Sequence, residues 1–320
     1  MRVAVVGGTG FIGRETVARL VAHEAEVLVI HRGKTQAPLP AEVSEAKADR
    51  MDEDALAAAL DSFQPETVID VLAMTEANTL PVLRAVSGRA ERYVLISSAD
   101  VYGNYGGLIG KEKEPPITRA LREDDPLREV RYPYRGNAPE GADDMRAFLD
   151  QYDKIVVEAL ARSELDLETT VLRLPMVFGP GDGQHRFAWM VKAARAGGRA
   201  QIDERIASWR ATHGYVTDMA EGIALAATDP RAHGKTYNLG RADTPTMAQW
   251  LGRVAKVLGV SLKIDVAPSG GLLADMAEGI HTKYPLVLDT GRIRSELEYR
   301  EIVPEDEALR RTIEWEEQGG

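Results

Sequence analysis

Three glycines at positions 7, 10 and 13 stand directly after a short β-branched run, Val3 to Val6. In this spacing the first glycine permits a tight turn, the second lets the backbone approach a pyrophosphate, and the third lets a helix pack closely on a strand. The N-terminus of that helix would offer free N–H groups and positive potential to phosphates. A tight turn without a ligand would use the same residues, but the position after a first strand favours a dinucleotide site.

A basic turn follows the next apolar run, Val27 to Ile30. In a site for NAD, an acidic residue about 20 residues beyond the glycine turn binds the ribose 2′-hydroxyl. This chain has His31-Arg32-Gly33-Lys34 there, and cations favour a 2′-phosphate, which a carboxylate would repel. We therefore expect NADP rather than NAD, with a solvent-exposed basic turn that binds nothing as the alternative.

The apolar pattern predicts the framework that positions these turns. Short buried strands (3–6, 27–30, 67–71, 93–96 and 169–174) alternate with helical spacings (11–23, 55–60 and 79–86). This alternation predicts the α/β class: a Rossmann-like, doubly wound parallel sheet covered by helices. We expect an NAD(P)-binding domain over 1–178 and a smaller, mainly substrate-binding α/β part over 179–320. Prolines, glycines and charges between 103 and 143 predict a lid-like insertion.

Composition excludes several classes of chemistry. The chain has 320 residues and a net charge of 39 − 50 = −11, which argues against a general binder of nucleic-acid backbones. It has no cysteine, so disulfides, thiolate nucleophiles and cysteine zinc sites are excluded. Its histidines and carboxylates show no metal-ligand spacing, so we expect no metal. No apolar run reaches the ~20 residues that span a bilayer, and we expect a cytoplasmic, soluble protein.

Several ordered motifs resemble those of the extended short-chain dehydrogenase/reductase family, also called the NAD-dependent epimerase/dehydratase family. The resemblance covers nearly the whole chain. The Arg32-Gly33-Lys34 turn is more similar to atypical members, including plant chloroplast relatives described as RNA-binding, than to the sugar epimerases. The motifs are the glycine turn, Asp49, Ser97-Ser98-Ala99-Asp100-Val101-Tyr102-Gly103, Lys154 with Glu158, the segment 173–181, Tyr215-Val216-Thr217-Asp218, and Tyr237-Asn238-Leu239-Gly240.

The resemblance implies roles for single residues. In the family, the lysine matching Lys154 bonds the nicotinamide ribose and lowers the pKa of a tyrosine, and the serine matching Ser98 hydrogen-bonds the substrate oxygen. The counterpart of Asp49 contacts adenine, and that of Pro175 lies beside the nicotinamide. Paired helices of two copies also imply a homodimer. The implied cofactor-binding residues are Gly7, Thr9, Gly10, Phe11, Ile12, Gly13, Arg32, Lys34, Asp49, Arg50, Leu72, Ala73, Lys154, Pro175 and Val177.

One position departs from the family pattern. The family's catalytic tyrosine lies four residues before the lysine, one turn away on the same helix face, and that position here is Asp150. Tyr152 lies two residues before Lys154, about 200° around a continuous helix, which argues against its use. We therefore place Asp150 with Ser98 and Lys154 as the catalytic set. A simple ion pair of Asp150 with Lys154, or a tyrosine from the lid, are the alternatives.

Two stretches border the substrate cleft in this fold, 184–187 and 209–213. Their arginines could clamp a carboxylate or phosphate, and their histidines could transfer protons. Surface ion pairs and structural histidines are the alternatives for these residues. The expected substrate-binding residues are Tyr102, Tyr132, Tyr134, Met176, His185, Arg186, Trp209, Arg210 and His213.

The sequence thus favours an NADP-dependent oxidoreductase, or an epimerase working through transient oxidation, on a small hydroxyl or carbonyl compound. A nucleotide-binding protein without redox turnover, acting as a sensor, scaffold or redox-neutral catalyst, is the first alternative, since the usual tyrosine is missing. An RNA-associated relative is the second, and the net charge of −11 counts against it.

Overall fold

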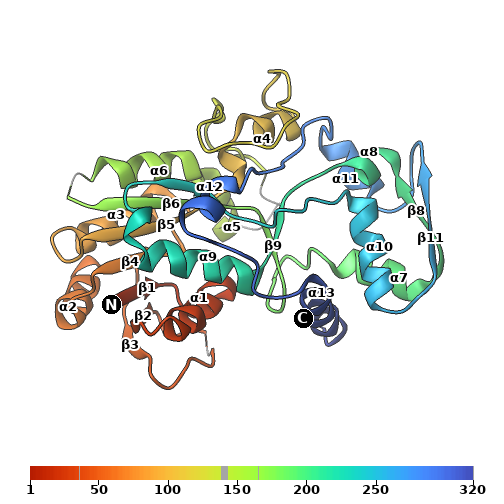
Figure 1. Cartoon of the computed structure of the whole chain (residues 1–320). Helices are drawn as coiled ribbons and strands as arrows, with labels where there is room; N and C mark the ends of the chain where they lie inside the picture. The colour runs from red at the N-terminus through yellow and green to blue at the C-terminus, as the bar shows by residue number, and fades with distance from the viewer. Residues whose placement is uncertain (36, 138–142, 165, 320) are drawn as a thin grey trace.

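The computed structural model describes residues 1–35, 37–137, 143–164 and 166–319, and its centre is a seven-stranded parallel sheet (Figure 1). The order across the sheet is β10-β6-β5-β4-β1-β2-β3. The direction of winding reverses between β1 and β4, and open parallel sheets bind ligands outside the carboxyl ends of the strands at such a point. The strands are β1 (Arg2–Val6), β2 (Glu26–His31), β3 (Ser44–Lys47), β4 (Thr67–Asp70), β5 (Arg92–Ser98), β6 (Glu168–Leu174) and β10 (Thr236–Asn238).

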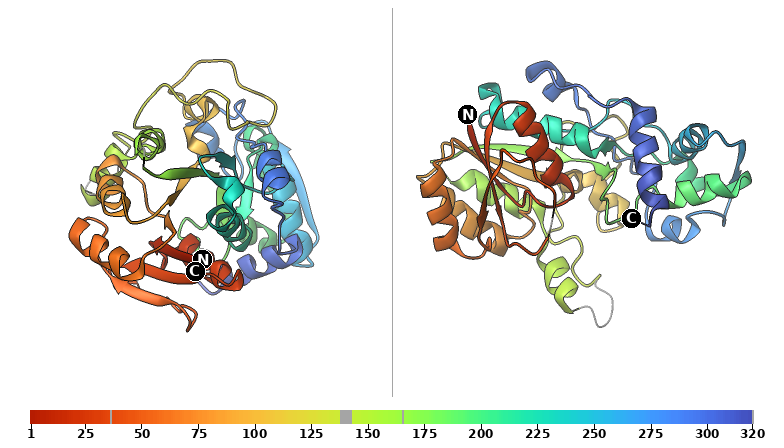
Figure 2. Two further views of the ribbon diagram at one scale, coloured as in Figure 1. Left: turned by 60° about the vertical axis from the view of Figure 1, so that its left-hand side comes forward. Right: turned by 90° about the horizontal axis from the view of Figure 1, so that it is seen from below.

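Both faces of the sheet are buried, because alternate residues of the strands belong to two different cores. Val3 and Val5 of β1 pack with helices α1 (Phe11–Ala22) and α9 (Val216–Thr228). Ala4 and Val6 face the opposite core, which helices α2 (Glu53–Phe63), α3 (Glu76–Val86) and α6 (Lys154–Ser163) cover. This is the doubly wound arrangement that the apolar runs predict, and Figure 2 shows the helices on the two sides of the sheet.

The rest of the chain after β6 forms most of a second region, seen beyond the carboxyl ends of the strands in Figure 1. Two small parallel sheets lie in it, β8 (Gly198–Asp203) with β11 (Leu262–Ala267), and β7 (Met176–Phe178) with β9 (His213–Tyr215). However, α9 and β10 return to the main sheet, where β10 pairs with β6. The division at residue 178 stays a prediction. The remaining helices here are α7 (Ala188–Ala196), α8 (Glu204–Ser208), α10 (Met247–Val257), α11 (Ala274–Gly279), α12 (Gly291–Glu296) and α13 (Glu305–Glu317).

The segment 103–143, expected to be a lid, begins with the short helix α4 (Gly103–Leu108) and ends where α5 (Asp143–Gln151) begins. Part of it is fixed to the body of the protein. Leu121 is fully buried and bridges to Leu288, and the Arg128 guanidinium donates to the backbone oxygen of Asp100 at 2.5 Å. Residues 138–142 of the expected lid lie outside the described residues.

Every strand predicted in the first part of the chain is present, and one more joins them. β3 was not predicted because its sequence, Ser-Glu-Ala-Lys, is polar. The strand lies at the edge of the sheet, and three of its four residues are exposed. Within the described residues, no helix is both long enough and apolar enough to cross a membrane.

Candidate functional site

The glycine turn lies between β1 and α1, at the point where the sheet order reverses. Gly7 has φ +90°, a conformation that favours glycine. A Cβ on Gly13 would lie 2.2 Å from the Gly7 carbonyl oxygen, so that position has no room for a side chain. Gly10 caps α1 without any side-chain hydrogen bond, which leaves the first N–H groups of the helix available. These features fit a pyrophosphate.

The basic turn after β2 presents two cationic side chains at the surface. Arg32 and Lys34 are exposed, and no hydrogen bond or ion pair to either side chain is present among the described residues. His31 instead faces the neighbouring strand, where its Nε2 lies 2.8 Å from the Glu45 carboxylate. The two cations nearest the expected phosphate are therefore uncommitted.

The other predicted cofactor residues have mixed environments. Arg50 is committed to the buried Asp70 carboxylate through two hydrogen bonds of 3.0 and 2.7 Å, so its side chain is already paired. Asp49 is exposed and accepts a hydrogen bond from the Met51 N–H. Leu72 packs against Gly7, since a Cβ added to Gly7 would lie 2.7 Å from the Leu72 side chain.

A cavity of about 310 Å³ opens beside the glycine turn, at the carboxyl ends of β4, β5 and β6. That volume lies in the range of small-molecule sites. Seven predicted site residues line it: Phe11, Ile12, Ser98, Lys154, Pro175, Val177 and Arg186. Gln184, from the stretch 184–187 expected to border the cleft, also lines it, and eight more were not predicted: Val71, Met74, Ile96, Ser97, Tyr152, Leu174, Asp182 and Gly183. The sequence therefore located the cavity and missed its phenol group.

The helix before Lys154 is interrupted, which corrects the prediction of a continuous helix. α5 ends at Gln151. Tyr152 forms an antiparallel bridge with Thr75, and Asp153 has an extended conformation with its carboxylate capping α6 through the Ile155 N–H. Because two extended residues separate the helices, Tyr152 is not turned away from Lys154. Both side chains line the same cavity.

Asp150 does not occupy the predicted position. Its carboxylate accepts a hydrogen bond from the Gly136 N–H at 2.8 Å, at an exposed place, and its backbone oxygen accepts from Arg135. It is absent from the residues that line the cavity. The prediction that Asp150 lies beside Lys154 is wrong, because it assumed one helix through residues 150–154.

Lys154 is held deep in the cavity wall. Its ammonium donates to the carbonyl oxygens of Ala73 at 2.6 Å and Ile96 at 2.8 Å. Burial lowers the pKa of Lys154 to about 8, because the charged form loses its hydration. Two carbonyl acceptors leave one N–H of the ammonium to point elsewhere.

The Tyr152 hydroxyl donates to the buried carboxylate of Asp100 at 2.8 Å. Burial first, and then the Asp100 charge, raise the pKa of Tyr152 well above its ordinary value. Burial likewise raises the pKa of Asp100, against the opposing charge of Arg128. The site thus pairs a neutral phenol with a carboxyl group whose proton affinity is increased.

Two of the tyrosines expected in a lid surround this pair. Tyr134 packs on the Tyr152 ring with centroids 5.1 Å apart, and its hydroxyl lies 2.7 Å from that of Tyr105. Tyr132 contributes its backbone N–H to the Asp153 carboxylate, and its ring stacks with Arg135 instead of lining the cavity.

Most other residues expected in the substrate pocket have structural partners. Tyr102 is buried and donates to Asn238 at 2.6 Å, and the Trp209 indole donates to the Tyr284 carbonyl. Arg210 bonds Thr244. Met176 pairs with His213 between β7 and β9, outside the cavity lining.

The two histidines also differ from the expectation. His185 lies 2.8 Å from the Glu316 carboxylate and stacks on Trp315 of α13. His213 is buried among aromatic rings, and burial lowers its pKa to about 4, so it is neutral at pH 7. Arg186 alone of the expected substrate residues lines the cavity, and it is paired with Asp182 at 2.5 Å.

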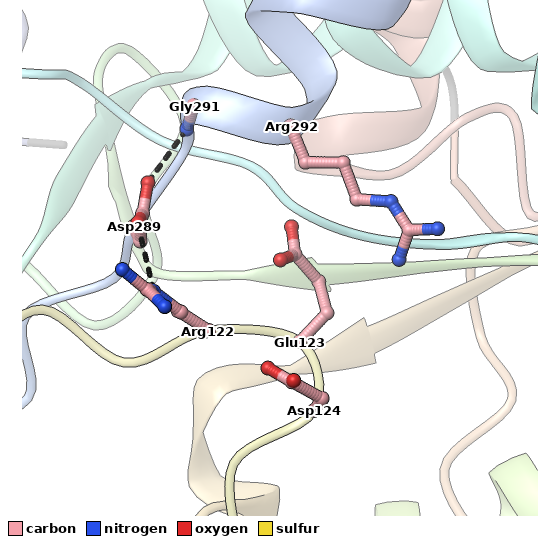
Figure 3. A pocket seen from close by; sticks show the side chains of 6 residues that line it. All are labelled: Arg122, Glu123, Asp124, Asp289, Gly291 and Arg292. Atoms are coloured by element: carbon pink, nitrogen blue, oxygen red, sulfur yellow. Dashed lines mark hydrogen bonds and ion pairs between the residues drawn. The ribbon is translucent and has the colours of Figure 1, made fainter.

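A second hollow, of about 390 Å³, lies away from these groups (Figure 3). Arg122 lies beside Asp289 across it, at 3.7 Å, and the Gly291 N–H donates to the same carboxylate. Three acidic side chains and two arginines line this hollow, together with one glycine. Because none of them is a predicted site residue, we assign it no part in cofactor binding.

Comparison with known proteins agrees with this architecture. The sequence model of the "NAD dependent epimerase/dehydratase family" matches residues 3–134 and 150–240. One relative is dTDP-6-deoxy-L-talose 4-dehydrogenase (NAD(P)(+)) of Kitasatospora kifunensis, 28% identical over 84% of this chain and 82% of its own length. Another is 2′-dehydrokanamycin reductase of Streptomyces kanamyceticus, 26% identical over 81% and 67%.

Solved structures share the fold at low sequence identity. A UDP-glucose 4-epimerase of Thermus thermophilus in complex with NAD has a TM-score of 0.67 and 22% identity, with both chains fully covered. MoeE5 in complex with UDP-glucose and NAD has a TM-score of 0.69 and 20% identity, over 100% of this chain and 99% of its own. With more than half of its residues matched by the family model, the chain belongs to the NAD dependent epimerase/dehydratase family of extended short-chain dehydrogenase/reductase enzymes.

Proposed function

We propose that this enzyme is an NADP-dependent oxidoreductase that interconverts a ketone and a secondary alcohol on a small polyhydroxylated compound. One observation carries the proposal: Ser98, Tyr152 and Lys154 line a single cavity that also contains Phe11 and Ile12 of the glycine turn. A hydroxyl, a phenol and an ammonium beside a dinucleotide turn are the groups that hydride transfer to a carbonyl requires.

The residues of the chain bind and orient the reactants. The glycine turn and the N-terminus of α1 would hold the pyrophosphate, and Arg32 with Lys34 would hold the 2′-phosphate. Lys154 donates to two backbone carbonyl oxygens, and its remaining N–H would bond the ribose beside the nicotinamide. Ser98 and Tyr152 hold the substrate oxygen. When bound, NADPH supplies the hydride. This assignment replaces Asp150 with Tyr152 as the group beside the substrate.

Polar residues in the cavity wall support this class of substrate. Asp182, Gln184 and Arg186 are among the lining residues, and the Arg186 side chain donates to the Asp182 carboxylate and to the Val177 backbone oxygen. Groups of this kind bind hydroxyl and amino substituents. The names of two relatives include a deoxysugar nucleotide and an aminoglycoside, both of which carry such substituents.

The first test is a calorimetric titration with NADPH and NADH, using the unsubstituted protein and the double variant Arg32→Ala/Lys34→Ala. We expect a preference for NADPH of at least about tenfold, ~1.4 kcal/mol, which the double variant loses while its affinity for NADH stays unchanged. Lys256→Ala, at an exposed position on α10, is the control. Equal affinities for the two nucleotides would remove the 2′-phosphate assignment, and binding of neither would overturn the proposal.

The second test is turnover, with dTDP-6-deoxy-L-talose and NADP⁺ in one direction and 2′-dehydrokanamycin and NADPH in the other. Tyr152→Phe removes the hydroxyl and keeps the ring. We expect it to lower kcat by about 10²–10⁴-fold, the usual contribution of one general acid or base. A Tyr152→Phe variant with full turnover would show that the proton comes from another group.

A further inference from the structure

Asp100 is a buried carboxylate that the preceding scheme does not use. It lies in the 3₁₀ turn Ala99–Val101 directly after β5, and it is 5% exposed. Its Oδ2 accepts from the Tyr152 hydroxyl at 2.8 Å, and the Tyr134 hydroxyl lies 3.4 Å from the same oxygen. Its Oδ1 is buried and has no hydrogen-bond partner among the described residues.

This arrangement restricts what Tyr152 can do. A phenol has one proton, and here that proton points to Asp100. Tyr152 can therefore accept a proton from a substrate alcohol while it passes its own proton to the carboxylate. It can donate to a substrate oxygen only if Asp100 is protonated and Tyr152 accepts from it.

The structure assigns Asp100 to a proton relay in which it acts through Tyr152, and this inference rests on the function proposed above. In ketone reduction, a bound dihydronicotinamide would supply the hydride for the new C–H bond. The substrate oxygen takes the Tyr152 proton while the Asp100 proton moves to the Tyr152 oxygen, so the products are the alcohol, the oxidised nicotinamide and the Asp100 carboxylate. Oxidation of the alcohol runs through the same transfers in reverse.

The surroundings of Asp100 are consistent with a carboxyl group that takes up and releases a proton. An ionised carboxylate with one buried, unpaired oxygen is costly, which favours the protonated form. The Arg128 guanidinium and the Lys154 ammonium favour the charged form, whereas the Asp153 carboxylate opposes it. Arg128 is itself paired with the Asp153 carboxylate at 3.1 Å, and burial outweighs the favourable charges, so the pKa of Asp100 is raised.

A second chain of hydroxyl groups offers a route for the proton to return. Tyr134 lies next to the Asp100 carboxylate, and the Tyr105 hydroxyl lies 2.7 Å from that of Tyr134. Both tyrosines are partly exposed, whereas Asp100 and Tyr152 are buried. Asp100 can thus exchange its proton with these two hydroxyl groups.

Infrared titration tests this relay without any substrate, because a protonated carboxyl has its own C=O band. Asp218 of α9 is the matched control. It is a buried aspartate with an unpartnered oxygen, and burial raises its pKa to about 6. We expect two aspartate carboxyl groups that titrate above the ordinary value of about 3.9, one absent in Asp100→Asn and the other absent in Asp218→Asn. Burial also raises the pKa of the Glu123 carboxyl, and its band should stay unchanged in both variants. Tyr152→Phe should shift the first and not the second.

Turnover provides the second measurement. Asp100→Asn keeps the shape of the side chain, and we expect it to lower kcat by about 10²–10³-fold, with the Kd for NADPH unchanged. In mixtures of H₂O and D₂O the unsubstituted enzyme should show two protons moving in the rate-limiting step, and Asp218→Asn should behave identically.

The outcomes separate the relay from the proposed function. If Asp100→Asn has the infrared titration of the unsubstituted protein, or keeps its kcat while Tyr152→Phe loses activity, the relay is wrong and the oxidoreductase assignment stands. If NADPH does not bind, the assignment itself fails. The infrared result decides the relay even where neither probe compound is turned over.

Discussion

Replacing Gly13 with alanine measures how closely α1 must approach β1 for the dinucleotide turn to form. The new Cβ would lie 2.2 Å from the Gly7 carbonyl oxygen, 2.9 Å from the Gly8 Cα and 3.0 Å from the Gly7 carbonyl carbon. All three are backbone atoms, so no flexible side chain can give way. The helix must move, by about 1 Å, to restore an ordinary carbon–oxygen contact.

The expected cost follows from this overlap. Overpacking of a dense interior costs about 1–3 kcal/mol, and the better helix propensity of alanine offsets about 0.5–1 kcal/mol of it. Gly252→Ala is the matched control, because Gly252 also lies within a helix and its Cβ would meet only Ile264, at 3.7 Å. We expect Gly252→Ala to be neutral or stabilising and Gly13→Ala to be destabilising.

Thermal unfolding with and without NADPH measures both the loss of stability and the loss of NADPH affinity in one assay. At an NADPH concentration of about 100 times the Kd of the unsubstituted protein, binding stabilises the fold by ~2.7 kcal/mol, and a tenfold weaker variant gains ~1.4 kcal/mol at the same concentration. Gly13→Ala should show the smaller gain, because the pyrophosphate contacts move with the helix. If it unfolds like Gly252→Ala and keeps the full gain from NADPH, the close approach of α1 is not what the turn requires.

Three further predictions concern the surroundings of the site. Asp153→Ala removes both the cap of α6 and the partner of the buried Arg128. We expect the free energy of unfolding in urea to fall by about 3–5 kcal/mol. A fall below ~1 kcal/mol would contradict a stabilising role for this ion pair. His213 has a pKa lowered to about 4, so the unfolded chain binds its proton first as the pH falls below ~6.5. The contribution of His213 to stability is complete above that pH and declines towards pH 4. His213→Phe should therefore flatten the pH dependence of the free energy of unfolding between these values. An unchanged slope would show that His213 is not the group responsible for it. Asp150→Asn should keep kcat within about twofold, since its carboxylate bonds Gly136 outside the cavity, whereas the ~10²-fold loss typical of a proton-transfer group would restore it to the site.

The sheet was predictable because the apolar residues of its strands show in the sequence that both faces are buried. Runs such as Val3 to Val6 are apolar on both faces, and only a sheet covered by helices on both sides buries them. β3 could not be found in this way, because an edge strand of polar residues has no such signal. Nor could the sequence show that His213 belongs to an aromatic core, because its neighbours Phe178, Phe187 and Trp250 come from distant segments.

Tyr152 was not predicted to line the cavity, although the sequence carries a signal for the helix break that places it there. A tyrosine two positions before a lysine faces away from it in a continuous helix, and the apolar spacing from 143 to 163 conceals any break. Asp153, however, directly precedes the apolar run of α6, and an aspartate in that position is typical of a helix N-cap. A cap at Asp153 predicts a new helix that begins at Lys154, so residues 150–154 would not form one continuous helix. The buried pair of Asp153 with Arg128 then stabilises that break. The break between α5 and α6 thus lets Tyr152 and Lys154, two residues apart, line one cavity.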